Sequence, residues 1–479
     1  MSKHIRWDVC ALLAGAGVLS FLLFVGPILG VADNGDFLRI MGSVGLSYPN
    51  PTEPFQDRYF AFMHKQFAMN TPGDGAYISS EVIVVFLATL VARLFNWNLF
   101  DIRFLGALYS VLLLIAFSCF LQLKLLSSKA AKISFTVVFL LIFFDAGYTA
   151  YFNSFFGEPM AFIFLLLTLA AALRLTQDRQ PRTAWFVFFI LCAMFMAASK
   201  IQNAPTGIIL ALLALRLLPL SSSKVWKRTG FPLTVGLILI STAIYVTAPK
   251  ELRMINQYQS VFYGILKDSP TPERDLMSLG LDPSLSILAN TNFFMPDTPI
   301  PQQSDQLKQS FYPYISHGKI ALFYLSHPSR YWDKLSVTAK HAMTIHIDYL
   351  GNHEKAAGFE PGTGSNSFNL WSELKDKVLP HSIWFLIVFW VLYYTVLLAL
   401  YTGEPARNQR AAYEIFMSVG VIAGVAFLVP LIGDGEADME KHLFLFNVCF
   451  DIMFTVSLVW IIHRCVIFMR ERASYSHLN

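Results

Sequence analysis

A short acidic segment, residues 32–39, directly follows the first long apolar run of the chain. It reads Ala-Asp-Asn-Gly-Asp-Phe-Leu-Arg and holds two carboxylates, Asp33 and Asp36, and the guanidinium of Arg39. If a helix starts at Asp33, the two carboxylates share one face of its first turn. Such a pair could do acid/base or metal chemistry in a cavity at the membrane surface. The structural alternative is that Asp33 is an N-cap and Asp36 a first-turn acid favoured by the helix dipole.

Two further ionisable side chains stand at the ends of apolar runs. Glu158 opens one such run in the sequence Phe-Gly-Glu-Pro, and Lys200 follows the next one. Ionisable groups at membrane depth are functional candidates by default, and a lysine there is suited to binding a phosphate. A structural role is the alternative for both, because helix ends favour an acid before a proline and a terminal lysine.

Other recognisable sites are not indicated by the sequence. The five cysteines lie in or beside apolar runs without metal-ligand spacing, so we expect neither a disulfide nor a zinc site. His341, His346 and His353 lack the spacing of a helical zinc pair, and no nucleotide-binding motif occurs. Several charged residues between 433 and 442 favour a solvated loop.

The composition indicates an all-α polytopic membrane protein. Of its 479 residues 55% are hydrophobic and 14% charged, whereas about a quarter of a soluble domain is charged. Apolar runs near the length of a bilayer span predict about ten transmembrane helices. They cover residues 9–31, 104–123, 133–149, 159–175, 183–199, 205–220, 230–248, 382–402, 411–432 and 443–463.

The distribution of basic residues predicts the topology. If Ile78–Phe95 crossed the membrane, Lys124 and Lys129 would lie opposite Lys3 and Arg6, against the positive-inside rule. We therefore expect Ile78–Phe95 to lie on the outer surface as a juxtamembrane helix. Both termini are then cytoplasmic, and two long outer segments follow.

These outer segments cover residues 32–103 and 248–381, the second being large enough for a small cap but without a dense core pattern. We divide the chain into a module over residues 1–230, with the first outer segment, and a variable module over residues 231–479, with the second.

The candidate residues all fall on the outer side, where cells supply no nucleotide donors. A transferase working there needs a lipid-carried donor, a base for the acceptor hydroxyl and cations for the lipid phosphate. The net charge of +4 gives no indication of a nucleic-acid partner.

The first 220 or so residues resemble the GT-C superfamily of membrane glycosyltransferases, which use polyprenyl-phosphate sugars. The resemblance rests on residues 33–37 after the first helix, on Arg93-Leu-Phe-Asn-Trp and Arg103 near the second crossing, and on Glu158. Asn96 departs from the glycine of the superfamily pattern. Residues 257–268 and 279–282 are similar to a narrower group, the WsfD-like hexose transferases of bacterial surface-glycan biosynthesis.

The resemblance implies a glycosyltransferase at the outer face of the bacterial plasma membrane. It would move a hexose from polyprenyl phosphate to a glycan or lipid-linked acceptor, with inversion. Asp33 or Asp36 would be the base, and the other, with Glu158, would orient the acceptor or hold a divalent metal such as Mg²⁺ or Mn²⁺.

The resemblance further implies that Arg39, Arg103 and Lys200 bind the donor phosphate. Membrane lipid is the remaining expected partner. A transporter or flippase of lipid-linked glycans is the rival class, although the chain lacks its internal repeats and paired helix breaks. A glycan polymerase is a third interpretation.

Overall fold

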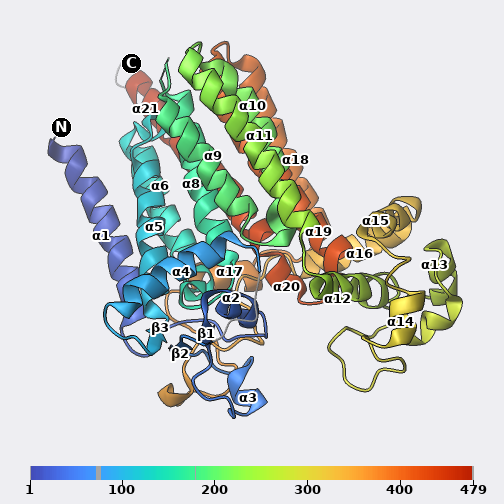
Figure 1. Cartoon of the computed structure of the whole chain (residues 1–479). Coiled ribbons are helices and arrows are strands. Elements are labelled where there is room, and N and C mark those ends of the chain that lie inside the picture. Colours follow the sequence, from blue (N-terminus) through green and yellow to red (C-terminus); the bar gives the residue numbers. More distant parts are fainter. Residues whose placement is uncertain (1, 72–76, 179, 477–479) are drawn as a thin grey trace.

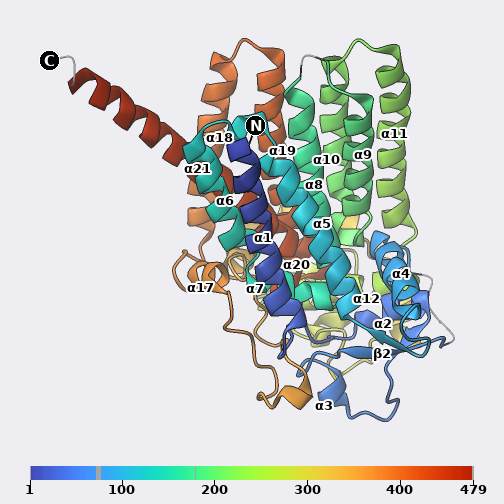
Figure 2. The same ribbon diagram turned by 90° about the vertical axis from the view of Figure 1, so that its left-hand side faces the viewer.

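Long helices, packed side by side, form most of the computed structural model, which describes residues 2–71, 77–178 and 180–476. Short helices and a small sheet gather at one end of this bundle, which we call the cap end (Figure 1). Both termini lie at the other end (Figures 1 and 2), as the expected topology requires.

The bundle contains a helix for each of the ten expected crossings. These are α1 (Ser2–Phe24), α5 (Arg103–Leu121), α6 (Lys129–Phe143), α8 (Glu158–Thr176), α9 (Thr183–Ala197), α10 (Ala204–Leu217), α11 (Lys224–Val246), α18 (Ile383–Gly403), α19 (Arg407–Asp434) and α21 (Phe444–Ser476).

Length and apolar composition allow eight of the described helical segments to span a membrane, or nine if a bent pair counts as one span. The bent pair joins α6 to α7 (Ala146–Thr149) and the 3-10 turn η2 (Ala150–Asn153), at an angle of 54°. The tenth, α9, has 15 residues and is shorter than a usual span. The polytopic helical class is therefore confirmed, with eight or nine qualifying spans where about ten were predicted.

The first helix ends earlier than predicted. Whereas residues 9–31 are one apolar run, α1 stops at Phe24, just before Gly26 and Pro27, and the chain then continues without regular structure. Backbone amides of this stretch bond to the second outer segment, from Gly30 to the carbonyl of Asn352 (3.1 Å) and from Ala32 to that of Gly351 (2.9 Å). The two outer segments are thereby joined immediately before the acidic motif.

Helix α4 (Ser80–Arg93) lies at the cap end in both views, where a juxtamembrane helix was expected (Figures 1 and 2). One of its faces, including Val84 and Val85, is buried. The opposite face exposes large apolar side chains at helical spacing: Ile83, Phe86, Leu87, Leu90 and Val91. This pattern is typical of a helix that rests on the membrane surface.

The rest of the first outer segment is small. Helix α2 (Phe37–Val44) follows the acidic motif, and the short α3 (Phe55–Arg58) comes later. A three-stranded antiparallel sheet, in the order β1 (Leu46–Ser47), β2 (Gln66–Met69) and β3 (Leu99–Asp101), ties the segment together.

The second outer segment has a hydrophobic core of its own, contrary to the expectation of no dense core. Tyr258, Phe262, Leu276, Leu307 and Phe311 are all fully buried in it. It holds α12 (Lys250–Ser260), the π-helical turn η5 (Val261–Ile265), α13 (Pro272–Ser278), η6 (Pro283–Leu288), α14 (Asp305–Ser310), α15 (His317–Ser326), α16 (Pro328–Lys340), η7 (Lys355–Ala357) and α17 (Leu370–Lys377). The core was missed because its side chains are dispersed along short helices and loops.

Short connecting elements complete the fold. They are η1 (Lys124–Leu126), η3 (Ile201–Asn203), η4 (Leu218–Leu220) and α20 (Met439–His442). Of these, η3 and α20 lie at the cap end and contribute to the candidate site.

Candidate active site

Carboxylates and cations from five parts of the chain meet at the cap end, in a group that we call the ionic cluster. It consists of Asp36 and Arg39 at α2, Glu81 in the first turn of α4, Glu158 at the start of α8, Lys200 before η3, and Lys441 in α20. Four of the six were candidates from the sequence. Glu81 and Lys441 were not.

Asp36 lies between two cations. Its Oδ1 atom accepts a hydrogen bond from Nη1 of Arg39 at 2.7 Å, and its Oδ2 atom accepts one from Nζ of Lys441. Lys441 is almost fully buried, whereas the Asp36 side chain is 25% exposed. Burial raises the pKa of Asp36, but the charges of Lys441, Arg39 and Lys200 outweigh it and hold the pKa well below the ordinary value. Asp36 is therefore ionised.

Glu158 and Lys200 form the third ion pair of the cluster. Nζ of Lys200 lies 2.5 Å from Oε1 of Glu158, whose Oε2 atom is buried without a hydrogen-bond partner. A Cβ atom at Gly157 would lie only 2.9 Å from both Cγ of Lys200 and the carbonyl oxygen of Ser199. Glycine is thus needed at position 157 for the two helix ends to meet.

Glu81 is the most deeply buried member of the cluster. Ser79 caps α4 by accepting a hydrogen bond from the Glu81 amide at 3.1 Å, and Oε1 of Glu81 has no hydrogen-bond partner. Burial raises the pKa of Glu81 well above the ordinary value, and the charge of Glu158 raises it further, while Lys200 opposes both. The signal in the sequence was a lone acid inside an apolar run.

A small cavity opens among these side chains. It has a volume of about 20 Å³ and is lined by Asp36, Arg39, Tyr77, Glu81 and Lys200. A cavity of this size has room for about one water molecule. The cluster therefore places cations, an ionised carboxylate and a buried carboxyl group with a raised pKa around one point.

Asp33 is buried outside this arrangement. Its Oδ1 accepts hydrogen bonds from the amides of Gly35 (2.7 Å) and Phe37 (3.1 Å), and its Oδ2 from the Tyr48 hydroxyl (2.7 Å). A helix start at Asp33, the condition under which Asp33 and Asp36 would share one face, is not observed: α2 begins at Phe37, and Asp33 fixes the turn before it. Burial raises the pKa of Asp33. These contacts give Asp33 a structural role in the turn, although the N-cap position of α2 is held by Asp36 and not by Asp33.

Comparison with known families adds an identification. A family model described as the YfdI N-terminal transmembrane domain matches residues 2–477. The chain belongs to this family. The YfdI match extends over the bundle helices and both outer segments, in agreement with a multi-pass membrane protein. No curated protein and no solved structure matches the chain.

The YfdI match names no narrower group, so the resemblance to WsfD-like transferases stays a prediction. The match runs through residue 230, where we expected a boundary between two modules, as one continuous range.

Arg103 of this YfdI-family chain is not brought to the cluster. Its guanidinium forms a two-pronged ion pair with Asp101, at 2.9 and 2.7 Å. Arg103 is therefore already engaged within its own segment.

A metal site is not evident at the cluster. Within the described ranges, no group of three or more histidine, cysteine, aspartate or glutamate residues is placed to hold a metal ion. The cluster carboxylates face lysine and arginine instead, so the suggested Mg²⁺ or Mn²⁺ has no ligand group there.

The expectation of a solvated loop at residues 433–442 is wrong. The Lys441 side chain is 2% exposed. Oδ2 of Asp434 lies 2.8 Å from Nε2 of His442, and Oδ1 of Asp434 accepts a hydrogen bond from Nε2 of Gln259 at 3.1 Å. Glu436 pairs with Lys267 of the second outer segment at 2.7 Å. These contacts fix the segment between the cap and the cluster, and so position Lys441.

Proposed function

We propose that the chain is a glycosyltransferase that moves a hexose from a polyprenyl-phosphate donor to a surface-glycan acceptor. The observation that supports this best is the position of Asp36 between Arg39 and Lys441, beside Lys200. Transfer from a lipid phosphate needs a base for the acceptor hydroxyl and cations for the leaving phosphate at one point. The membership in a family of transmembrane domains is consistent with a lipid-linked donor.

Asp36 is the proposed base. Among the three cluster carboxylates it is the accessible one, because Glu81 and Glu158 are at most 2% exposed. The acceptor oxygen attacks the anomeric carbon with inversion, the bond from that carbon to the phosphate oxygen breaks, and the phosphate leaves with the electron pair. The acceptor proton passes to a carboxylate oxygen of Asp36.

The cations are proposed to bind the donor phosphate and thereby to activate the base. Arg39, Lys200 and Lys441 hold the pKa of Asp36 low while no donor is bound. A phosphate that neutralises these charges would let the pKa of Asp36 rise towards its ordinary value, where it is a better proton acceptor. Base strength would then depend on the presence of the donor.

The two buried acids are proposed to support this centre. Glu158 holds Lys200 in place through its 2.5 Å contact. Glu81 lines the same small cavity and has a raised pKa, so that in its protonated form it could donate a hydrogen bond to a sugar hydroxyl.

The proposed orientation follows from the basic residues. Lys129 and Lys227 lie in the first turns of α6 and α11, on the side of the termini, which the positive-inside rule places in the cytoplasm. The cluster then faces the outer side of the plasma membrane, with the lipid-linked donor and acceptor as partners.

The test is release of free polyprenyl phosphate from a labelled polyprenyl-phosphate hexose by the purified protein in nanodiscs. Release that depends on the protein is expected. Movement of intact donor between leaflets without cleavage would contradict the proposal and favour a flippase. Successive elongation of one glycan would indicate a polymerase.

A further inference from the structure

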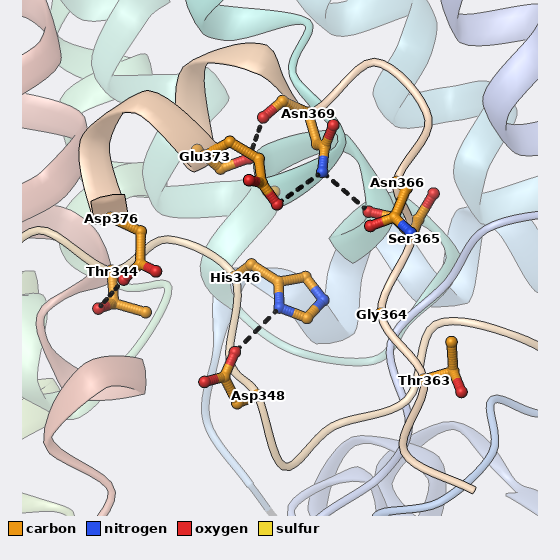
Figure 3. Close-up of a pocket in the computed structure, with 12 residues that line it drawn as sticks. Thr344, His346, Asp348, Thr363, Gly364, Ser365, Asn366, Asn369, Glu373 and Asp376 are labelled. Atoms are coloured by element: carbon orange, nitrogen blue, oxygen red, sulfur yellow. Dashed lines mark hydrogen bonds and ion pairs between the residues drawn. The ribbon is translucent and has the colours of Figure 1, made fainter. Parts of the chain in front are cut away.

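A larger cavity lies at the cap end, separate from the ionic cluster (Figure 3). Its volume is about 390 Å³, within the usual size of small-molecule sites. Helix α17 forms one wall, and residues 344–348 and 363–366 form the others.

The side chains of this cavity suit a neutral, hydroxyl-rich ligand. Its polar lining includes the carboxylates Asp348, Glu373 and Asp376, the amides Asn366 and Asn369, and the imidazole of His346. These groups supply both hydrogen-bond donors and acceptors. No lysine or arginine is among the residues that line it in the described part of the chain. An anionic ligand would meet three carboxylates, of which Glu373 is partly neutralised by Lys377 outside the lining.

The α17 wall of the cavity is firmly anchored. Lys375 and Asp451 are fully buried and paired at 2.7 Å, and Nε1 of Trp371 donates to Asp451 at 2.8 Å. Asp145 accepts hydrogen bonds from the Ser372 amide at 3.1 Å and the Ser372 hydroxyl at 2.6 Å. A buried ion pair is costly unless its geometry is well satisfied, and here it fixes the helix that carries Glu373 and Asp376. A rigid wall of this kind lowers the entropy cost of binding.

One loop connects this cavity to the ionic cluster. His346 and Asp348 line the cavity, and Tyr349, the next residue, is hydrogen-bonded to Asp438. Asn34, two residues before Asp36, also donates to Asp438, at 3.3 Å. A ligand in the cavity is therefore held against the same loop that borders the proposed reaction centre.

We propose that this cavity binds the neutral sugar residues of the glycan acceptor. The proposal rests on the function proposed above, since it gives the acceptor a place that is linked to the base through Tyr349, Asp438 and Asn34. It also assigns a substrate class, because uronic or phosphorylated sugars would be repelled by the three carboxylates.

Saturation-transfer NMR on the full chain in nanodiscs tests it. The probes are neutral disaccharides of glucose, galactose or mannose, and matched disaccharides that contain a uronic acid. Asn366→Trp fills the cavity mouth from an exposed position, and Gln306→Trp, at an exposed position of α14, is the matched control. Glu373→Gln removes one negative charge without changing shape.

Neutral disaccharides are expected to show saturation transfer from the wild type and from the Gln306→Trp control. Asn366→Trp should abolish it, and Glu373→Gln should weaken binding about tenfold, as for loss of a hydrogen bond to a charged group. Three results would overturn the proposal. They are the absence of saturation transfer to every neutral probe, saturation transfer that Asn366→Trp leaves unchanged, and equal saturation transfer to the probes that contain a uronic acid.

The same measurement on Asp36→Asn separates this proposal from the function on which it rests. Neutral sugars should bind to Asp36→Asn as they do to the wild type, since Asp36 does not line the cavity. If neutral sugars bind but the wild-type protein does not cleave the donor, the transferase function is refuted and the sugar site remains. Cleavage without any sugar binding would refute the site alone.

Discussion

Nζ of Lys200 lies 2.5 Å from Oε1 of Glu158, while Oε2 of the same carboxylate is buried without a hydrogen-bond partner. The pair joins the start of α8 to the turn between α9 and η3. Removing one member of a buried pair leaves an uncompensated charge, which costs more than removing both.

Lys200→Met should therefore lower the free energy of unfolding by about 3 kcal/mol. The double variant Lys200→Met with Glu158→Gln should recover most of this stability but no transferase activity, because the cation for the phosphate is still missing. Thermal unfolding in detergent and donor cleavage would be measured together. A double variant no more stable than Lys200→Met alone would show that the contact carries little coupling energy.

Asp33→Asn should keep most activity. The amide oxygen can still accept from Gly35 and Phe37, and the amide nitrogen can donate to the Tyr48 hydroxyl. Asp33→Ala should instead lower the free energy of unfolding by about 1–3 kcal/mol, since buried donors are left unpaired. Loss of activity in a stable Asp33→Asn protein would return Asp33 to the list of candidate bases.

Part of the site could be predicted from the sequence, because acids and bases next to apolar runs must lie near the membrane edge. This found Asp36, Arg39, Glu158 and Lys200. Lys441 was missed because its partner Asp36 is 405 positions away, and only the folded chain shows that residues 433–442 are packed. Asp33 and Arg103 were also candidates, and local partners hold both outside the cluster.

The helices were easier to predict than the cap. Apolar runs located the ten bundle helices, and the distribution of basic residues set Ile78–Phe95 apart from them, because a bilayer imposes simple patterns of length and charge. The core around Tyr258 and Phe262 depends on contacts between short helices far apart in sequence, for which no such pattern exists.

Glu81 predicts a dependence of stability on pH. Unfolded, it releases its proton near pH 4.5, but in the folded chain burial keeps it protonated to a higher pH. The folded state binds more protons in this interval, so the free energy of unfolding should fall as the pH rises above about 4.5. For Glu81→Gln the free energy of unfolding should fall less steeply over the same pH interval, as measured by thermal unfolding. Identical slopes for the two proteins would show that Glu81 is ionised in the folded state.

Lys441→Met should raise the KM for the donor about tenfold or more, as expected for losing a charged hydrogen bond to phosphate. Asp36 keeps its pairing with Arg39, so the fold should tolerate the change. Arg103→Gln removes the same charge from a residue already paired with Asp101, and is the control. A larger effect of Arg103→Gln on KM would place the donor phosphate at Arg103 instead.

The central claim is that Asp36 accepts the proton of the acceptor. An amide can take part in hydrogen bonds but cannot serve as this base. The most direct measurement is therefore the rate of polyprenyl-phosphate release, with acceptor present, by wild type, Asp36→Asn and Asp57→Asn. Asp57 is the matched control, a partly exposed carboxylate of the same outer segment that pairs with Lys355. Asp36→Asn should be slower by a factor on the order of 10²–10⁴, with Asp57→Asn close to wild type. Near-normal release by a folded Asp36→Asn protein would contradict the account.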